Sequence, residues 1–208
     1  MPPTTRSEQK AATRRRILEV AAQHFAARGY AATSLNDLST ALGLTKGTIF
    51  FHFTSKAELA RAISEDVADQ WVPLHAAHEE RGTRGLVALV ESSRQVAHLY
   101  RESAVFRAAS RLRLEAENID AELPVPFVGW IDLARTYLAQ AQADGELVEG
   151  VDVDETAWHV VAWFAGVQEV STHLSHLDDL TSRVEGMWRI LLRAVARDPE
   201  AVLGTSGR

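Results

Sequence analysis

The chain has 208 residues and no cysteine, and this absence excludes several kinds of site. Without cysteine there is no disulfide framework, no thiolate metal site and no cysteine nucleophile. Long hydrophobic runs are also absent, because no stretch reaches the length of a membrane span. Residues 1–19 are polar and basic and lack the apolar core of a signal peptide. We therefore expect a cytoplasmic protein that is neither exported nor embedded in a membrane.

Sequence motifs of catalysis are missing as well. The chain holds no glycine-rich phosphate loop, no G-x-S-x-G nucleophile elbow and no H-E-x-x-H zinc motif. Its densest group of possible metal ligands lies at residues 173–179, where we favour a solvated helix end over a metal site. We expect no enzyme activity, no catalytic residues, no cofactor and no bound metal.

Positive charge is scarce over most of the chain. Residues 1–56 contain eight basic and three acidic side chains, a net charge of +5, whereas the remainder contains 14 basic and 25 acidic side chains, a net charge of −11. All three lysines lie in the first part, and all five tryptophans lie in the second. This asymmetry predicts a small basic module that meets a polyanion, joined to a larger acidic body that binds something else.

The basic module has the pattern of three short helices. Apolar residues at helical spacing predict a first helix that ends at Gly29. Ser34, followed three residues later by an aspartate, opens a second helix over 35–42. Thr45 then caps a third helix over 46–52 after a tight turn. Two helices joined in this way form a helix-turn-helix motif.

The first residues of the third helix have the chemistry of base recognition. In a helix-turn-helix motif the second helix enters the major groove and its N-terminal residues meet base edges. Lys46 can reach a guanine or a phosphate, Gly47 permits close approach, and Thr48 offers a hydroxyl and a methyl group. Three phenylalanines follow. We expect Phe50, Phe51 and Phe53 to belong to the hydrophobic core rather than to stack on bases, because they fall too close together to share one face of a helix. Of the three, Phe50 is expected nearest the surface.

This module resembles the DNA-binding signature of the TetR family of transcriptional repressors. The resemblance covers about the first 60 residues and is carried above all by residues 43–53, Gly-Leu-Thr-Lys-Gly-Thr-Ile-Phe-Phe-His-Phe. It implies an all-helical homodimer that binds a palindromic operator through its N-terminal motifs and a small effector through its C-terminal body. The family usually has tyrosine where this chain has Phe50, so we expect the phosphate hydrogen bond of that hydroxyl to be absent. The predicted DNA-binding residues are Thr33, Ser34, Thr45, Lys46, Gly47, Thr48, Phe50, His52 and Lys56. Of these, Thr33, Ser34, Thr45 and Lys56 flank the motif where phosphates are expected to lie.

The acidic body is predicted to be helical throughout, for a total of about nine helices in an all-α fold. A fourth helix opens at Ser55 and is expected to continue through Val67 to Trp71. The last two helices, over 157–174 and 180–195, carry apolar stripes that suit either an intrachain core or a four-helix bundle between two protomers. The resemblance favours the homodimer. We expect a DNA-binding domain at 1–54 and an effector-binding and dimerisation domain at 55–208.

Several segments of the body resemble the γ-butyrolactone receptor branch of the family. They are residues 103–109, 123–127 with Trp130, 151–154 and 166–168. That branch contains receptors for γ-butyrolactones, butenolides and 2-alkylfuran carboxylic acids, diffusible signals that switch on antibiotic synthesis in actinomycetes. The loop over 122–127 is especially similar to the furan receptors of the branch.

A signal with a small oxygenated ring and an alkyl tail needs a dry apolar tunnel, a flat wall and one or two polar anchors. Trp130 can cover the ring while its indole N–H donates, and Phe127 shares its helical face. Arg113 can anchor a ligand carboxylate, or it can pair with Glu117. For each apolar candidate the alternative is plain core. The predicted ligand-binding residues are Val67, Trp71, Arg113, Phe127, Trp130 and Phe164.

The sequence thus predicts a repressor that releases operator DNA when it binds a diffusible signal, and that controls signalling or antibiotic genes. The fourth helix is expected to couple the two sites, because it begins near the DNA and continues to the effector. The main alternative is a TetR-type repressor of an exporter or metabolic operon that answers a different small hydrophobic ligand. A DNA-binding protein without effector sensing is a further alternative.

Overall fold

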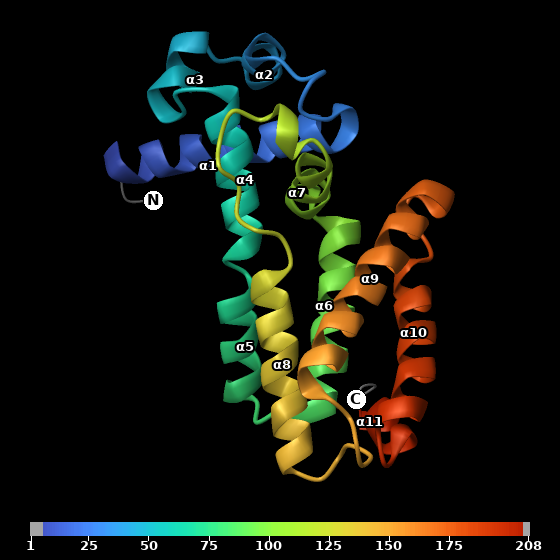
Figure 1. The fold of residues 1–208 in the computed structure, drawn as a ribbon. Helices are drawn as coiled ribbons and strands as arrows, with labels where there is room; N and C mark the ends of the chain where they lie inside the picture. Colours follow the sequence, from blue (N-terminus) through green and yellow to red (C-terminus); the bar gives the residue numbers. More distant parts are fainter. Residues whose placement is uncertain (1–5, 206–208) are drawn as a thin grey trace. The chain divides into compact units, whose positions relative to one another are not determined.

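The computed structural model describes residues 6–205, and within this range the fold is entirely helical apart from one isolated bridge between Leu147 and Ala196 (Figure 1). The predicted all-α class is therefore confirmed. The helices are α1 (Arg6–Arg28), α2 (Leu35–Leu42), α3 (Lys46–His52), α4 (Lys56–Ala68), α5 (Trp71–Glu80), α6 (Gly85–Glu102), α7 (Ala104–Leu114), the 3-10 helix η1 (Ala116–Asn118), α8 (Val128–Ala143), α9 (Val153–Ser175), α10 (Leu180–Val195) and α11 (Pro199–Thr205).

The chain forms two compact units. The first contains the residues up to Asp69 together with Ser103–Val125, and the second contains Gln70–Glu102 together with the residues from Pro126 onward. Helix α7 thus returns to the unit that holds the helix-turn-helix motif. The predicted division into 1–54 and 55–208 concerned function rather than packing, and it stays a prediction.

The core of the first unit is built on the buried stripe of α1. Ile17, Ala21 and Phe25 are fully buried on this stripe, and α1 packs mainly against α7, which also contacts α4. The predicted helix caps are present. Ser34 and Asp37 form a capping box at α2, and Gly43 ends that helix in a left-handed conformation with φ +64°.

The fourth helix is shorter than predicted. Helix α4 ends at Ala68, and Trp71 is the first residue of a separate helix, α5. Pro73 explains the break, because its nitrogen has no hydrogen to donate to the carbonyl of Asp69 and its ring would clash with that carbonyl in a continuous helix. The expectation of one helix running from the helix-turn-helix motif to Trp71 was wrong.

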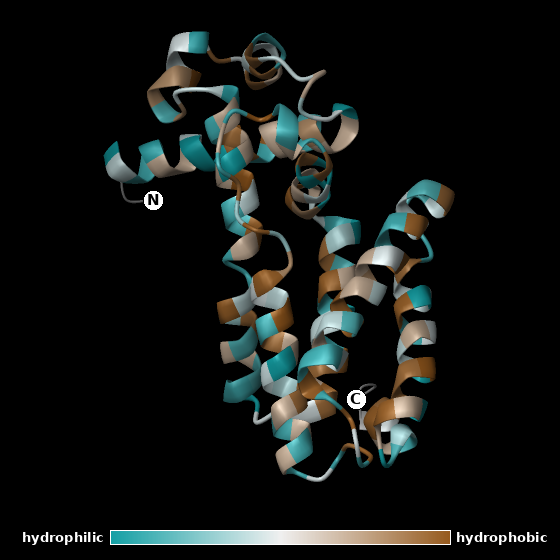
Figure 2. Ribbon diagram, viewed as in Figure 1, coloured by the Kyte–Doolittle hydropathy of each residue, from teal (hydrophilic) through white to brown (hydrophobic). Residues whose placement is uncertain are grey.

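The second unit is a helical bundle around one aromatic core. Helix α8 packs against α6 and α9, and α10 packs against α6 and α9. The core holds Tyr137, Phe164 and Trp188 among many aliphatic residues. Figure 2 shows hydrophobic and hydrophilic residues alternating along the long helices, as amphipathic helices require. No helix of the described chain is long and apolar enough to cross a membrane.

Candidate DNA and effector sites

The start of α3 is fixed by a side-chain cap. The Thr45 hydroxyl accepts a hydrogen bond from the backbone N–H of Thr48 at 3.1 Å and shares a second bond with the Thr48 hydroxyl at 2.9 Å. Lys46 and Gly47 follow with exposed side-chain positions, and Thr48 is half-buried. The structure therefore presents the three residues predicted to meet base edges together, at the open N-terminal end of one helix.

Gly47 is not required by the protein's own packing. A Cβ atom added there would come no closer than 3.7 Å to the Thr45 hydroxyl oxygen, which is an ordinary contact. A glycine inside a helix costs roughly 1 kcal/mol relative to alanine. The fold thus tolerates an unfavourable residue at the surface of α3, which is the expected pattern where another molecule must approach closely.

Two predicted phosphate contacts differ in their surroundings. Ser34 is exposed at the N-cap of α2, where its hydroxyl donates to the Asp37 carboxylate at 2.7 Å; this bond lowers the pKa of Asp37. Thr33 is only 1% exposed, and its hydroxyl donates to the Gly29 carbonyl at 2.8 Å. The Thr33 side chain stabilises the turn after α1, so we leave it out of the proposed DNA site.

Lys56 is held mainly by the protein itself. Its ammonium group donates to the carbonyls of Tyr30 and Thr33 at 2.8 and 2.9 Å and lies 4.0 Å from the centroid of the Tyr30 ring. Burial lowers its pKa, and the charge of Glu115 opposes that effect. The third N–H of this ammonium group is what remains for the predicted phosphate contact.

The three phenylalanines at and just after the end of α3 differ in their burial, and the sequence predicted this burial only in part. Phe53 is fully buried, as predicted, and Phe50 is exposed. Phe51 is 70% exposed, so its expected place in the core was wrong. His52 is half-buried, and burial followed by the charges of Lys10 and Arg14 lowers its pKa.

Glu115 supports the helix-turn-helix motif from far along the chain. Its two carboxylate oxygens accept hydrogen bonds from the backbone N–H groups of Tyr30 and Ala31, both at 3.1 Å. Gly29 has φ +80°, and a Cβ there would lie 2.2 Å from a Glu115 oxygen. Sequence reasoning missed Glu115, because no local pattern connects positions about 85 residues apart.

An aromatic cluster in the second unit gathers four of the predicted ligand-binding residues. Trp130 of α8 stacks on Trp71 of α5, with ring centroids 5.4 Å apart and planes 8° apart. Phe164 of α9 meets the same indole edge-on at 4.6 Å. Phe127, at the N-cap of α8, packs against this core. Gly129 allows the stack, because a Cβ there would come 2.6 Å from Trp71.

The indole N–H of Trp130 has no hydrogen-bond partner among residues 6–205. The residue is 3% exposed, and its Nε1 atom makes no hydrogen bond within the described part of the chain. An unsatisfied buried donor costs about 1–3 kcal/mol, and structures rarely keep one without a reason. The N–H is therefore available to an acceptor that the protein does not itself supply.

The other two predicted ligand-binding residues belong to the first unit. Val67 lies on α4, and Arg113 is a half-buried residue of α7. Their roles stay predictions. The alternative pairing of Arg113 with Glu117 is likewise untested.

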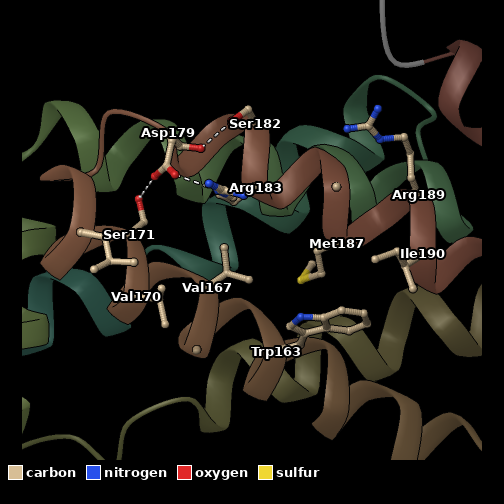
Figure 3. A pocket seen from close by; sticks show the side chains of 13 residues that line it. Trp163, Val167, Val170, Ser171, Asp179, Ser182, Arg183, Met187, Arg189 and Ile190 are labelled. Atoms are coloured by element: carbon tan, nitrogen blue, oxygen red, sulfur yellow. Dashed lines mark hydrogen bonds and ion pairs between the residues drawn. The ribbon is translucent and has the colours of Figure 1, made fainter.

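A groove lies between α9 and α10, with a volume of about 820 Å³ (Figure 3). Its floor is mostly apolar, and Figure 3 shows Trp163 and Met187 facing each other across it. At its polar end Asp179 accepts hydrogen bonds from Ser171 at 2.6 Å and Arg183 at 2.7 Å. These bonds, with a further one from Ser175, hold the pKa of Asp179 far below its ordinary value.

The predicted apolar stripes of α9 and α10 lie mostly inside the second unit. Most of their residues, such as Phe164 and Trp188, are buried in its core, as the intrachain alternative predicted. The exposed large apolar residues of the two helices are Trp158, Trp163, Val170, Leu174 and Ile190, and of these only Leu174 belongs to a predicted stripe. Gly166 and Gly186 lie beside them, and a Cβ added to either would meet no atom within 4 Å.

His173 and Asp179, at the two ends of the histidine- and aspartate-rich segment 173–179, have separate partners. His173 makes a ring-nitrogen hydrogen bond to the Glu169 carbonyl at 2.9 Å, and Asp179 is held by serines and an arginine. Across residues 6–205, no three histidine, aspartate or glutamate side chains gather as they would around a metal ion.

Comparison with known proteins matches both parts of the chain to one family. The tetR family of bacterial regulatory proteins matches residues 17–63, and the tetracyclin repressor-like C-terminal domain matches residues 83–197. The A-factor receptor protein of Streptomyces griseus is 32% identical over 184 residues, which cover 88% of this chain. The chain spans 64% of the length of that relative.

Solved structures agree. One that concerns control of antibiotic production by bacterial hormones is 36% identical, with a TM-score of 0.84, and covers 89% of this chain and 98% of its own. A γ-butyrolactone receptor is 29% identical, with a TM-score of 0.78 and coverages of 98% and 97%. CprB from Streptomyces coelicolor, bound to its operator sequence, is 30% identical, with a TM-score of 0.81 and coverages of 97% and 95%. The chain therefore belongs to the TetR family of bacterial regulatory proteins, in the branch that contains the γ-butyrolactone receptors.

Proposed function

We propose that this chain is a dimeric transcriptional repressor that binds a palindromic operator and is released by a small diffusible signal of the γ-butyrolactone, butenolide or alkylfuran type. It acts by binding rather than catalysis, and it acts in the cytoplasm, where operator DNA lies. The genes it controls are those of signalling or antibiotic synthesis. The resemblance to the hormone and γ-butyrolactone receptors supports this choice of signal.

The DNA-binding part of the proposal is supported by α3. Lys46, Gly47 and Thr48 stand at its exposed N-terminal end, and Ser34 and Thr45 cap the two helices of the motif beside them. In a dimer the two copies of α3 would enter major grooves about 34–36 Å apart, or a multiple of that distance. An operator with matching half-site spacing is the expected target.

The effector part is carried by one observation, the buried N–H of Trp130, which has no partner in the part of the chain that the structure describes. A lactone or furan signal has carbonyl or ring oxygens that can accept this hydrogen bond. The flat ring of the signal suits the wall made by Trp71, Trp130 and Phe164, and its alkyl tail suits the apolar residues around them. Trp130 is therefore the proposed anchor.

The dimer is supported by the exposed face of α9 and α10. Its large apolar residues include Trp158, Leu174 and Ile190, which a protein in water covers when it can. The open glycines at 166 and 186 allow another helix to approach closely. A second copy of the same face would close a four-helix bundle, which is the arrangement predicted for the last two helices.

The covalent connections between the two units offer routes by which the sites can be coupled. The chain passes between the two units after Asp69, Glu102 and Val125. Trp71 and Phe127 are each the second residue after one of these crossings, and both belong to the aromatic cluster. A signal that moves either side chain therefore acts directly on a connection to the DNA-binding unit.

The proposal can be tested with the DNA upstream of the chain's own gene. Fluorescence anisotropy would compare binding to this duplex with binding to a mixed-sequence duplex of equal length. We expect preference for the upstream duplex, and release on adding a γ-butyrolactone, a butenolide or an alkylfuran carboxylic acid. Equal binding to both duplexes would contradict the operator assignment. Preferential binding that none of the three compounds releases would contradict the proposed class of signal.

A further inference from the structure

Helix α1 extends well beyond the core that it helps to build. The helix begins at Arg6, whereas its first buried residue is Ile17. The residues between are exposed, with the partial exception of Thr13. About three turns of helix therefore lie outside the core of the first unit, and packing within that unit does not account for their presence.

These turns carry a line of positive charge. Arg6, Lys10 and Arg14 are spaced by four residues, so they lie on one side of the helix and continue the line of Ile17 and Ala21. We call these three side chains the basic stripe. Like charges at this spacing destabilise a helix by a few tenths of a kcal/mol per pair, roughly the amount that opposite charges gain. The helix would be more stable without this arrangement.

The basic stripe forms no ion pair with an acidic side chain of the described residues. None of its three side chains is paired with a carboxylate within 4 Å across the part of the chain that the structure describes. The charge of Arg14 lowers the pKa of Glu58, but that carboxylate already accepts hydrogen bonds from the N–H and hydroxyl of Thr54. The positive charge of the stripe is therefore available to bind another molecule.

The basic stripe lies beside the end of the recognition helix. The Lys10 ammonium group lies 5.0 Å from the centroid of the exposed Phe51 ring, and the Arg14 guanidinium lies 4.7 Å from that of Phe53. Both cations also lower the pKa of His52. Figure 1 shows the N-terminal half of α1 passing below α3 in that view.

This position corresponds to the edge of a DNA groove. Helix α3 has seven residues and is about 10 Å long, whereas the major groove is about 12 Å wide. With Lys46 at the base edges, the C-terminal end of α3 reaches the phosphates that border the groove. Phe50 offers them no hydroxyl there, whereas Lys10 and Arg14 lie beside this end of α3 and can donate hydrogen bonds to them.

We propose that the basic stripe of α1 binds the phosphate backbone of the operator next to the groove that α3 enters. The proposal rests on the DNA-binding function and adds Arg6, Lys10 and Arg14 to the interface. Contacts of this kind orient the protein and raise affinity for any duplex without reading sequence. The aromatic rings beneath Lys10 and Arg14 hold the cations in place.

The test is the salt dependence of DNA binding by Lys10→Gln. Each lost phosphate contact lowers the slope of log affinity against log salt by about 0.9. We expect this loss per protomer on both the upstream and the mixed-sequence duplex, with the preference between them unchanged. Lys10→Arg should keep the wild-type slope. Arg15→Gln is the matched control, because it removes the same charge from an exposed position about 140° around the helix.

The other possible results of this experiment would contradict the phosphate contact, the operator assignment or both. An unchanged slope for Lys10→Gln would overturn the proposal, as would an equal loss for Arg15→Gln. Weaker binding with the wild-type slope and a lower unfolding temperature would assign Lys10 a purely structural role. A wild-type protein that does not prefer the upstream duplex would contradict the operator assignment, while the mixed-sequence slopes would still decide on the stripe. Failure to bind either duplex would contradict both.

Discussion

At the residue scale, the proposed effector site depends on a single polar group, the indole N–H of a buried tryptophan. Trp130 and Trp188 are both buried, and both have an indole N–H without a partner in the described chain. Trp130 also stacks on Trp71 in a cluster that includes Phe164, which makes it the proposed anchor. The two tryptophans therefore provide a natural comparison.

Trp130→Phe keeps an aromatic ring in place and removes the N–H. We expect the signal to bind about 5- to 150-fold more weakly, because its acceptor loses a buried hydrogen bond worth roughly 1–3 kcal/mol. Operator affinity should not change. Titration of the operator complex with each signal compound measures the effect, and Trp188→Phe is the matched control. Equal losses in the two variants would argue against Trp130 as the anchor.

Glu115→Ala should destabilise the helix-turn-helix unit. The backbone N–H of Tyr30 would lose its acceptor in a partly buried position, which costs about 1–3 kcal/mol, whereas the exposed N–H of Ala31 can bond to water instead. Thermal unfolding of the variant measures the loss, and the exposed Glu117→Ala should leave the unfolding temperature close to that of the wild type. If both variants unfold like the wild type, Glu115 does not support the turn.

His78 should make the stability depend on pH. Its fully buried ring interacts with Arg81 at 3.0 Å and Ser92 at 3.1 Å, and burial lowers its pKa below the ordinary 6.5. Because the unfolded chain takes up a proton first, stability is complete above about pH 6.5 and falls as the pH drops toward the folded-state pKa. We expect His78→Gln to flatten the pH dependence of unfolding in this window, and the exposed His159→Gln to leave it unchanged. Parallel curves for His78→Gln and the wild type would refute this role.

At the scale of helices, the sequence predicted best where one residue acts locally. Ser34 and Thr45 identify the starts of α2 and α3, since a cap needs only its own helix. The end of the fourth helix was predicted too late, at Trp71 instead of Ala68, because the apolar spacing continues up to Pro73. Most of the exposed face of α9 and α10 was missed, because the strongest apolar stripe of a helix identifies its intrachain core first. Contacts such as that of Glu115 depend on the tertiary fold and leave no local signal.

Gly166→Leu tests the face that α9 is proposed to present to a second copy. The position is open, so a leucine should not disturb the isolated chain and should favour the helix by up to about 1 kcal/mol. In a dimer it would hold the partner helix away. We expect the dimer to dissociate at concentrations where the wild type stays associated, as measured by sedimentation. Thr136→Leu, at an exposed position of α8, is the control. A dimer of undiminished affinity in Gly166→Leu would place the interface elsewhere.

At the scale of the whole molecule, the change of net charge along the sequence separates the helix-turn-helix motif from the aromatic cluster. The basic residues 1–56 contain the helix-turn-helix motif, and the acidic remainder contains all five tryptophans and the aromatic cluster. Packing divides the chain differently, since α7 returns from the acidic part to the DNA-binding unit. Composition could not predict that return, because it reflects tertiary contacts of α7 with α1 and α4. The three crossings between units give a signal its routes to the DNA.

We expect the signal and the operator to favour different conformations of the same molecule. A signal can release DNA only if it binds the DNA-free protein more tightly than the DNA-bound protein. The most direct measurement is the affinity of the releasing compound, whether a γ-butyrolactone, a butenolide or an alkylfuran carboxylic acid, for the free protein and for its complex with the upstream duplex. We expect affinity for the complex to be weaker by about 5- to 150-fold, the usual range of allosteric coupling. Equal affinity for the two states would contradict the proposed switch.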